Sequence, residues 1–197
     1  MKKSVTAVLV LSMFAASSAM AASTSESSFN GYLNSLTSSP GSSTTTTANI
    51  QLSSGHYFSP QLVGRLVLFE NVSRSADSSG NITSDTGMLA LGGGLKYYFS
   101  SPAKGNWVGY GFGDLSLLSV TSTSTSSYTI GNVLYTSTST STGSGTQLDV
   151  GVGAANFITE DISMDIDVKS LSQSYTISGN SISQAGYQFD VGFTVRF

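Results

Sequence analysis

The chain has 197 residues and no cysteine; 10% of its residues are charged, and its formal net charge at pH 7 is −3. An acidic chain without a basic stripe is poorly suited to neutralise phosphates, which argues against nucleic-acid binding. The missing cysteines exclude disulfides and thiol chemistry, and the recurring apolar and aromatic residues argue against disorder.

Residues 1–21 have the layout of a secretory signal peptide. Lys2 and Lys3 give a positive start, residues 7–16 form a short apolar run, and small residues precede the predicted cut. The run is too short for a spanning helix, and a buried N-terminal helix is the alternative interpretation. Cleavage would leave one domain, residues 22–197, with six basic and eleven acidic residues and a formal net charge of −5.

The mature chain contains no run of ~18 consecutive apolar residues, so membrane-spanning helices are not expected. The other structure that spans a bilayer is a closed β-barrel, because hydrocarbon tolerates no unpaired backbone groups. A strand of such a barrel needs only ~9–11 residues, and its side chains alternate between lipid and interior.

The first half of the mature chain is predicted to contain four strands. Three have an irregular pattern and cover residues 28–36, 48–59 and 62–74. The fourth covers residues 86–99, with leucines and aromatic residues on one face and small residues and Lys96 on the other. Apolar side chains outside and small or charged ones inside are typical of a transmembrane barrel.

The second half is predicted to contain four more strands. Residues 107–120 have an irregular pattern, whereas residues 147–158 and 162–170 again set apolar side chains against small or charged ones. The last strand covers residues 185–197. Eight is an even number, which an antiparallel barrel needs if both termini lie on one side.

Asp114 conflicts with this scheme, because it shares a face with Phe112, which we expect to contact lipid. A charged side chain on the lipid face destabilises a barrel near the bilayer midplane. We therefore predict a β-bulge near Gly113 that turns Asp114 inward and directs Leu115 and Leu117 outward.

The connections alternate between short turns and long hydroxyl-rich tracts. The short turns, which contain Pro or small polar residues, are at residues 57–61, 98–104 and 157–161. The long tracts are residues 37–47, 75–85, 121–145 and 173–183. We interpret these tracts as loops, with continuation of some of them as strands beyond the membrane as the alternative. Short periplasmic turns and long extracellular loops are the arrangement of bacterial barrels.

Aromatic side chains gather beside the short turns. They are Tyr57, Phe58, Tyr97, Tyr98, Phe99, Trp107 and Phe157. Amphipathic rings favour the membrane–water boundary, which predicts an interfacial girdle. Packing inside the end of the sheet is the alternative. His56, the only histidine, falls at the same end, where we expect an interfacial residue rather than the base of a hydrolase.

The last predicted strand has the most regular pattern of the chain. Its apolar face carries Tyr187, Phe189, Val191, Phe193, Val195 and Phe197. This row, with an aromatic residue at the final position, resembles the C-terminal signature of outer-membrane barrels. The resemblance implies that the barrel-assembly machinery reads it during biogenesis.

With these strands and turns, the chain resembles the small eight-stranded outer-membrane barrels, a group that includes OmpX, Ail and the membrane domain of OmpA. The similarity covers residues 27–197 as a pattern, and the last strand alone matches a specific motif. It implies an all-β fold, an eight-stranded antiparallel transmembrane β-barrel in contact with lipid of the bacterial outer membrane. It also implies a narrow lumen filled by side chains, and action through surface loops in adhesion, surface protection or envelope structure.

Charged residues on the inward faces predict a polar network in the lumen. Its cations are Arg65, Lys96, Lys169 and Arg196, and its carboxylates are Asp149, Asp165, Asp167 and Asp190. Charges removed from water need partners, so four against four predicts a cross-linked plug, with a gated ion path as the alternative. Arg65 is the least regular member, because Val63 and Val67 share its face. No catalytic or metal role is expected for Asp165 and Asp167, because Lys169 follows on the same face.

We expect a non-enzymatic protein without a cofactor, since glycine runs such as residues 92–94 open no helix and form no phosphate loop. Its hydroxyl-rich loops would bind glycans or partner proteins of a host or another surface. The best contact candidates are Tyr128, Ile130, Val133, Leu134 and Tyr135. Two alternatives remain open: a narrow channel or carrier for a small solute, and a soluble exported β-sandwich subunit.

Overall fold

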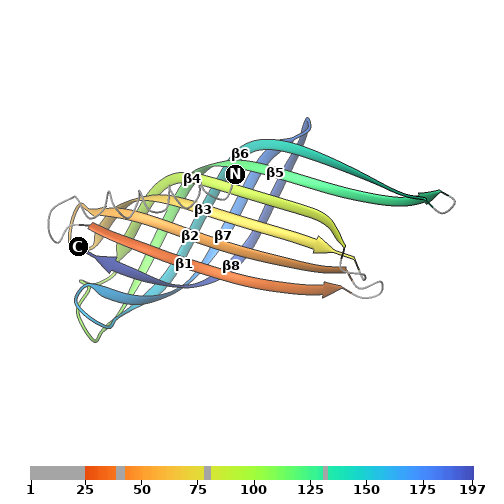
Figure 1. Ribbon diagram of the computed structural model, residues 1–197. Helices are drawn as coiled ribbons and strands as arrows, with labels where there is room; N and C mark the ends of the chain where they lie inside the picture. Colours follow the sequence, from red (N-terminus) through yellow and green to blue (C-terminus); the bar gives the residue numbers. More distant parts are fainter. Residues whose placement is uncertain (1–24, 39–42, 78–80, 131–132) are drawn as a thin grey trace.

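The computed structural model describes residues 25–38, 43–77, 81–130 and 133–197, which form eight strands (Figure 1). The strands are β1 Ser25–Ser38, β2 Ser43–Tyr57, β3 Leu62–Ala76, β4 Ile82–Tyr98, β5 Trp107–Ile130, β6 Val133–Phe157, β7 Ile162–Ile177 and β8 Asn180–Arg196. No helix among these residues is long and apolar enough to cross a membrane. The predicted signal peptide, residues 1–21, lies outside the described residues.

Each strand pairs with the next in antiparallel fashion, and β8 pairs with β1, so that a single sheet closes into a barrel. This confirms the predicted eight-stranded antiparallel barrel. A sandwich requires two sheets packed face to face, so the β-sandwich alternative is wrong.

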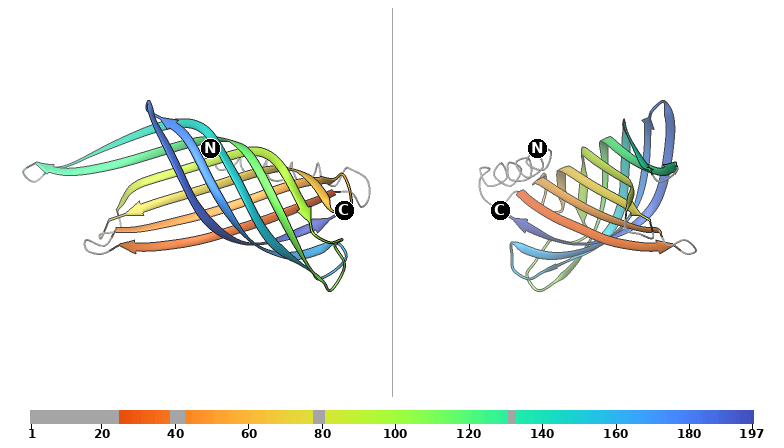
Figure 2. Two further views of the ribbon diagram at one scale, coloured as in Figure 1. Left: turned by 180° about the vertical axis from the view of Figure 1, so that it is seen from behind. Right: turned by 45° about the vertical axis from the view of Figure 1, so that its right-hand side comes forward.

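The two ends of the barrel differ. The turns that connect β2 to β3, β4 to β5 and β6 to β7 lie at the same end as the C-terminus, called the turn end below (Figure 1). At the opposite end, called the hairpin end, β5 and β6 project well beyond the neighbouring strands (Figure 2). The hydroxyl-rich tracts therefore lie at the hairpin end, as the predicted alternation of short turns and longer connections implies.

Most of the hydroxyl-rich tract at residues 121–145 forms strand, so its interpretation as a loop is wrong. β5 and β6 pair without a break from Trp107 opposite Asn156 to Ile130 opposite Val133. The β-branched threonines favour a pleated backbone, and facing hydroxyl side chains bond across the pair. One such bond joins Thr123 to Thr140 at 3.2 Å.

The tract at residues 173–183 is also mostly strand. β7 and β8 remain paired up to Ile177 opposite Asn180, which leaves two residues for the turn. These are Ser178 with φ 51° and Gly179 with φ 81°. Two consecutive residues with positive φ are the mark of the tight hairpin turn whose twist matches the strands. The strands that flank the tracts at residues 37–47 and 75–85 likewise extend further into these tracts than predicted.

The pairing between β1 and β8 is short. It covers Glu26–Gly31 of β1 and Val191–Arg196 of β8. Beyond this segment β8 turns away from β1 together with β7, as both views in Figure 2 show. The barrel is therefore closed around its full circumference at the turn end and opens on one side toward the hairpin end.

The interior contains large apolar side chains as well as polar ones, which the sequence analysis did not predict. One buried cluster comprises Val63, Tyr98, Val108, Tyr110, Phe112, Ala155 and Phe157. A second comprises Phe69, Ala90, Leu118, Val120 and Tyr175. The outward faces carry exposed apolar side chains, as predicted, including Leu91, Leu95 and Val152.

The predicted aromatic girdle is divided between the two faces of the sheet. Phe58, Tyr97, Phe99 and Trp107 are exposed on the outside. Tyr98 and Phe157 are fully buried inside, where Tyr57 packs against them, so their assignment to the girdle is wrong. Neighbouring residues of a strand point to opposite faces. Tyr97 and Tyr98 therefore cannot both contact lipid.

Candidate functional site

Seven of the eight residues predicted for the lumen network are buried inside the barrel. They are Arg65, Lys96, Asp149, Asp165, Asp167, Lys169 and Asp190, each at most 8% exposed. Arg196 differs, because its guanidinium lies at the turn end, where Nη2 donates to the backbone oxygen of Glu160. Its guanidinium carbon is 4.7 Å from the centre of the Phe157 ring. Within the described part of the chain, Arg196 forms no ion pair with a carboxylate.

Lys96 is the central cation near the turn end. Its Nζ lies 3.4 Å from Glu26 Oε1 and 3.9 Å from Asp165 Oδ2. It also lies over the rings of Tyr98 and Tyr110, at 4.6 and 4.4 Å from their centres. A cation over an aromatic face is attracted by the ring, most strongly where water is excluded. The arrangement joins β1, β4, β5 and β7 at one level of the barrel.

Glu26 was missing from the predicted network. It is 2% exposed and accepts hydrogen bonds from the hydroxyls of Tyr57 at 2.6 Å and Tyr98 at 3.0 Å. The predicted strand began at residue 28, three positions after the first residue of β1. Extending its alternation backward from Ser28 would have placed Glu26 on the same inward face.

Arg65 pairs with Asp114 in the middle of the barrel. Arg65 Nε donates to Asp114 Oδ1 at 2.7 Å, and Nη2 donates to Oδ2, which makes a two-point contact between β3 and β5. Arg65 also lies over the Phe112 ring, 4.5 Å from its centre. The register of β5 is continuous with both β4 and β6 at Gly113, so the predicted bulge is wrong.

Asp114 is buried and Leu115 and Leu117 are exposed, as predicted, but the cause is different: the whole face of β5 that carries Asp114, which we expected to contact lipid, lines the interior. Tyr110 and Phe112 share that face, and both are buried. Glycines on β6 leave room for their rings: a Cβ at Gly153 would lie 2.5 Å from Tyr110 Cζ, and one at Gly151 would lie 2.5 Å from Phe112 Cζ. A strand with small inward residues opposite a strand with rings was the signal that could have corrected the assignment.

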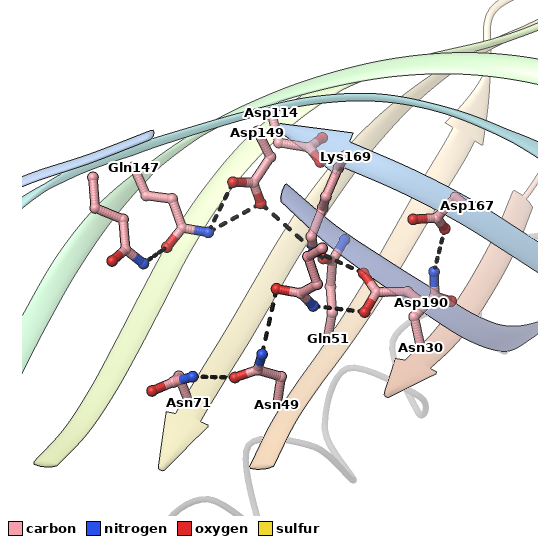
Figure 3. A network of polar contacts seen from close by, with 12 residues as sticks. Asn30, Asn49, Gln51, Asn71, Asp114, Gln147, Asp149, Asp167, Lys169 and Asp190 are labelled. Atoms are coloured by element: carbon pink, nitrogen blue, oxygen red, sulfur yellow. Dashed lines mark hydrogen bonds and ion pairs between the residues drawn. The ribbon is translucent and has the colours of Figure 1, made fainter. Parts of the chain in front are cut away.

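Lys169 is the central cation of a second polar network, nearer the hairpin end than Lys96 and called the upper network below (Figure 3). Its Nζ lies 3.0 Å from Asp190 Oδ2 and 3.9 Å from Asp149 Oδ2, and it donates to Gln51 Oε1 at 2.6 Å. These contacts link β7 to its neighbours β6 and β8 and, across the lumen, to β2. Gln147, which the sequence analysis missed, donates to both oxygens of Asp149 at 3.1 and 3.0 Å.

Asp167 has neutral partners. Asn30 donates to its Oδ2 at 3.0 Å, and the Tyr110 hydroxyl donates to the same oxygen at 3.2 Å. Asp167 stands opposite Asp190 in the β7–β8 register. Like charges in directly opposed positions destabilise a strand pair. The amide and the phenol therefore stabilise a carboxylate that has no cation of its own among the described residues.

The predicted balance of four cations and four carboxylates is wrong. Among the residues that the structure describes, the buried cations are Arg65, Lys96 and Lys169, and the buried carboxylates are Glu26, Asp114, Asp149, Asp165, Asp167 and Asp190. The interior is thus rich in carboxylates whose oxygens accept hydrogen bonds from amide and hydroxyl groups. No group of three or more His, Cys, Asp or Glu side chains in the described ranges is arranged to hold a metal ion.

The C-terminal row faces outward. Tyr187, Phe189, Val191, Phe193 and Phe197 are exposed, with Val195 half-buried among them. Asp190 and Thr194, between them in sequence, are buried inside. The outward row is the face that would contact lipid in a membrane. Its recognition by assembly machinery stays a prediction.

The five candidate loop contacts lie at the tip of the β5–β6 hairpin. Tyr128 pairs with Tyr135 and Ile130 with Val133 in the register, so Tyr128, Ile130, Val133, Leu134 and Tyr135 belong to the ends of two strands. Tyr135 is 44% exposed. The side chains of residues 128–134 lie outside what the structure describes. The contact role of all five residues therefore stays a prediction.

Known structures share this architecture. The crystal structure of Neisserial surface protein A matches with a TM-score of 0.55 and 17% identity, over 88% of this chain and 96% of that chain. OprG from Pseudomonas aeruginosa has a TM-score of 0.49, 12% identity and coverage of 89% and 96%. Ail of Yersinia pestis has a TM-score of 0.47 and 13% identity, over 89% of this chain and 100% of that chain. Neither a family model nor a curated protein sequence matches the chain. The likeness to Neisserial surface protein A confirms the fold of the small eight-stranded outer-membrane barrels.

Proposed function

We propose that this chain is a non-enzymatic protein of the bacterial outer membrane, which presents its hairpin end at the cell surface for adhesion, surface protection or envelope structure. The observation that carries the proposal is the β5–β6 hairpin, which projects from the barrel as two long paired strands (Figure 2). A paired hairpin on a filled barrel is a rigid arm. Such an arm suits display better than catalysis.

The outer face of the barrel supports a membrane location. Exposed apolar side chains occupy the outward positions of β4, β6 and β8, including Leu91, Val152 and Phe189. A band of this kind would be unfavourable in water, and it matches the lipid-facing band of transmembrane barrels. The hairpin end would then face the outside of the cell, because the short turns of such barrels face the periplasm.

The chemistry of the hairpin supports surface contact. Sixteen of the 25 residues at 121–145 are Ser or Thr, and the side chains of residues 135–140 are exposed. Each hydroxyl both donates and accepts a hydrogen bond. An uncharged, hydroxyl-rich arm therefore fits glycans or the backbone of partner proteins better than it fits ions.

The filled interior supports a closed barrel over the channel alternative. Polar contacts cross the lumen at more than one level: the ion pair Lys96–Glu26 joins β4 to β1, and the hydrogen bond from Lys169 to Gln51 joins β7 to β2. An eight-stranded barrel has an interior just wide enough for side chains to fill. In planar lipid bilayers the purified protein should give no stable conductance. A steady, reproducible conductance would favour the channel.

The hairpin proposal is tested by shortening the arm. Residues 123–140 are replaced by Asn-Gly, which joins the facing residues Ser122 and Ser141 by a tight turn. The matched control replaces Ser178 and Gly179 of the β7–β8 turn by the same dipeptide. Bacteria that display the shortened protein should adhere less to epithelial monolayers and survive less in serum than bacteria with the control. Equal adherence and equal survival would contradict the proposal.

A further inference from the structure

A cavity of about 400 Å³ lies in the mouth of the barrel at the hairpin end. Its wall is formed by inward side chains of β2, β3, β4, β7 and β8, and none of the residues described for β5 and β6 lines it. The volume is within the usual range of small-molecule sites, ~300–1,000 Å³. The cavity, called the cup below, is thus separate from the projecting hairpin.

Carboxamides are prominent in the lining of the cup, and none of its described lining residues is charged. Five amides face it: Asn49, Asn71, Gln173, Gln184 and Gln188. Three hydroxyl side chains and the apolar side chains of Phe69, Met88, Leu171 and Tyr175 complete the lining. An amide presents both donors and acceptors, so the wall offers both kinds of hydrogen bond without a net charge.

Hydrogen bonds to one another and to the polar network on the turn-end side hold part of the amide set in place (Figure 3). Gln188 Nε2 donates to Asp190 Oδ1 at 2.6 Å, Asn49 Nδ2 donates to Gln188 Oε1 at 3.3 Å, and Asn71 Nδ2 donates to Asn49 Oδ1. Across the cup, Gln173 Nε2 donates to Gln147 Oε1 at 2.9 Å. These bonds fix the orientation of the amides, so fewer rotamers are lost when a ligand binds.

Some amide groups remain available. Among the described residues, no hydrogen bond is made by the side chain of Gln184, which stands opposite Gln173 in the β7–β8 register. One oxygen each of Asn71 and Gln173 is likewise without a donor in the described part of the chain. The two neighbouring glutamines and Asn71 thus place free donors and acceptors on different walls of the same cavity.

The cup is closed on the side that faces the turn end. The Lys169 network lies on that side, and Phe69 and Tyr175 of the second apolar cluster form part of the wall. A molecule that enters from the hairpin end therefore stops in the cup. Toward the same end, β1 and β8 are no longer paired beyond Gly31 and Val191.

We propose that the cup binds a neutral polyhydroxylated ligand, a carbohydrate unit of one or two sugar rings. Sugar hydroxyls donate and accept at once, which matches a wall of amides and hydroxyls. The uncharged lining gives ions no counter-charge. Tyr175 and Met88 provide apolar surface for the C–H face of a ring. The proposal is independent of the display function, because none of the lining residues that the structure describes belongs to the hairpin strands.

The test uses the full mature chain, folded in micelles of a long-chain alkyl dimethylamine oxide. Glucoside and maltoside detergents are avoided because their sugar headgroups would compete with the probes. Methyl β-glucoside, methyl β-galactoside and N-acetylglucosamine are the probes, and saturation-transfer NMR reports their binding. At least one probe should receive saturation from the protein. Gln184→Leu and Asn71→Leu should each weaken its apparent affinity about fivefold, the effect of one lost hydrogen bond.

Gln61→Leu is the matched control, because Gln61 is a carboxamide at the turn end, bonded to Tyr97 and remote from the cup. It should leave binding unchanged. Gln184 is exposed and makes no side-chain bond within the described residues, so its substitution is not expected to impair folding, which heat-modifiable gel mobility checks. Absence of saturation transfer for all three sugars, or equal binding by Gln184→Leu and wild type, would overturn the proposal.

Discussion

Replacing Lys169 by methionine would remove the cation of the upper network while keeping a side chain of similar length. Lys169 is fully buried, 3.0 Å from Asp190 and 3.9 Å from Asp149. Removing one partner of a buried pair leaves the other charge uncompensated, which destabilises a protein by about 3–5 kcal/mol. Two carboxylates depend on this ammonium group, so we expect a loss at the upper end of that range.

Urea unfolding of the barrel in lipid vesicles measures this loss as a lower transition midpoint. Adding Asp190→Asn to Lys169→Met should recover part of the stability, because one uncompensated charge is then removed. Asp167→Asn alone should leave the midpoint unchanged or raise it, since Asp167 faces Asp190 and is bound by neutral donors. A wild-type midpoint for Lys169→Met would refute the account of the interior as an interdependent charge network.

Two further substitutions test the packing and the outward row. The Cβ that Gly153→Ala adds would lie 2.5 Å from Tyr110 Cζ. Overpacking of this kind should destabilise the barrel by about 1–3 kcal/mol. Gly87→Ala, where no atom lies within 4 Å of the added Cβ, is its control in the same unfolding assay, and equal effects would contradict the packing account. Phe197→Ala should reduce the amount of folded protein in outer-membrane fractions, as the resemblance to the assembly signature implies. Phe58→Ala, another exposed aromatic at the turn end, should not.

The barrel and much of its facing could be predicted from the sequence. Regular alternation in the last strand placed Phe189 outside and Asp190 inside, and the structure has both there. The same reasoning placed Lys96, Asp165 and Lys169 inside. It succeeds wherever one face is wholly apolar and the other small or charged, because the period of two then has a single reading.

It failed where both faces of a strand carry apolar residues. In β5 the inward Tyr110 and Phe112 face Gly151 and Gly153 of β6, so their environment is decided by a partner strand. Alternation within β5 cannot reveal which of its faces meets that partner. The unneeded bulge at Asp114 followed from choosing the wrong face.

Strand length and charge balance were also beyond local reasoning. Ser and Thr are as common in loops as in polar strands, and pairing along the whole hairpin decides between the two. The number of buried carboxylates depended on Glu26, which precedes the predicted strand, and on Asp114. Arg196 was counted as a partner, but the turn at Glu160 binds its guanidinium instead.

The central claim is that odd-numbered residues near the end of β8 face lipid and even-numbered ones face the interior. The chain lacks cysteine, so single cysteines at positions 189 to 192 can each carry a nitroxide label in lipid vesicles. Collision with oxygen, which concentrates in hydrocarbon, should be high for labels replacing Phe189 and Val191 and low for those replacing Asp190 and Gly192. High oxygen collision at the two even positions, with low values at the odd ones, would contradict the account.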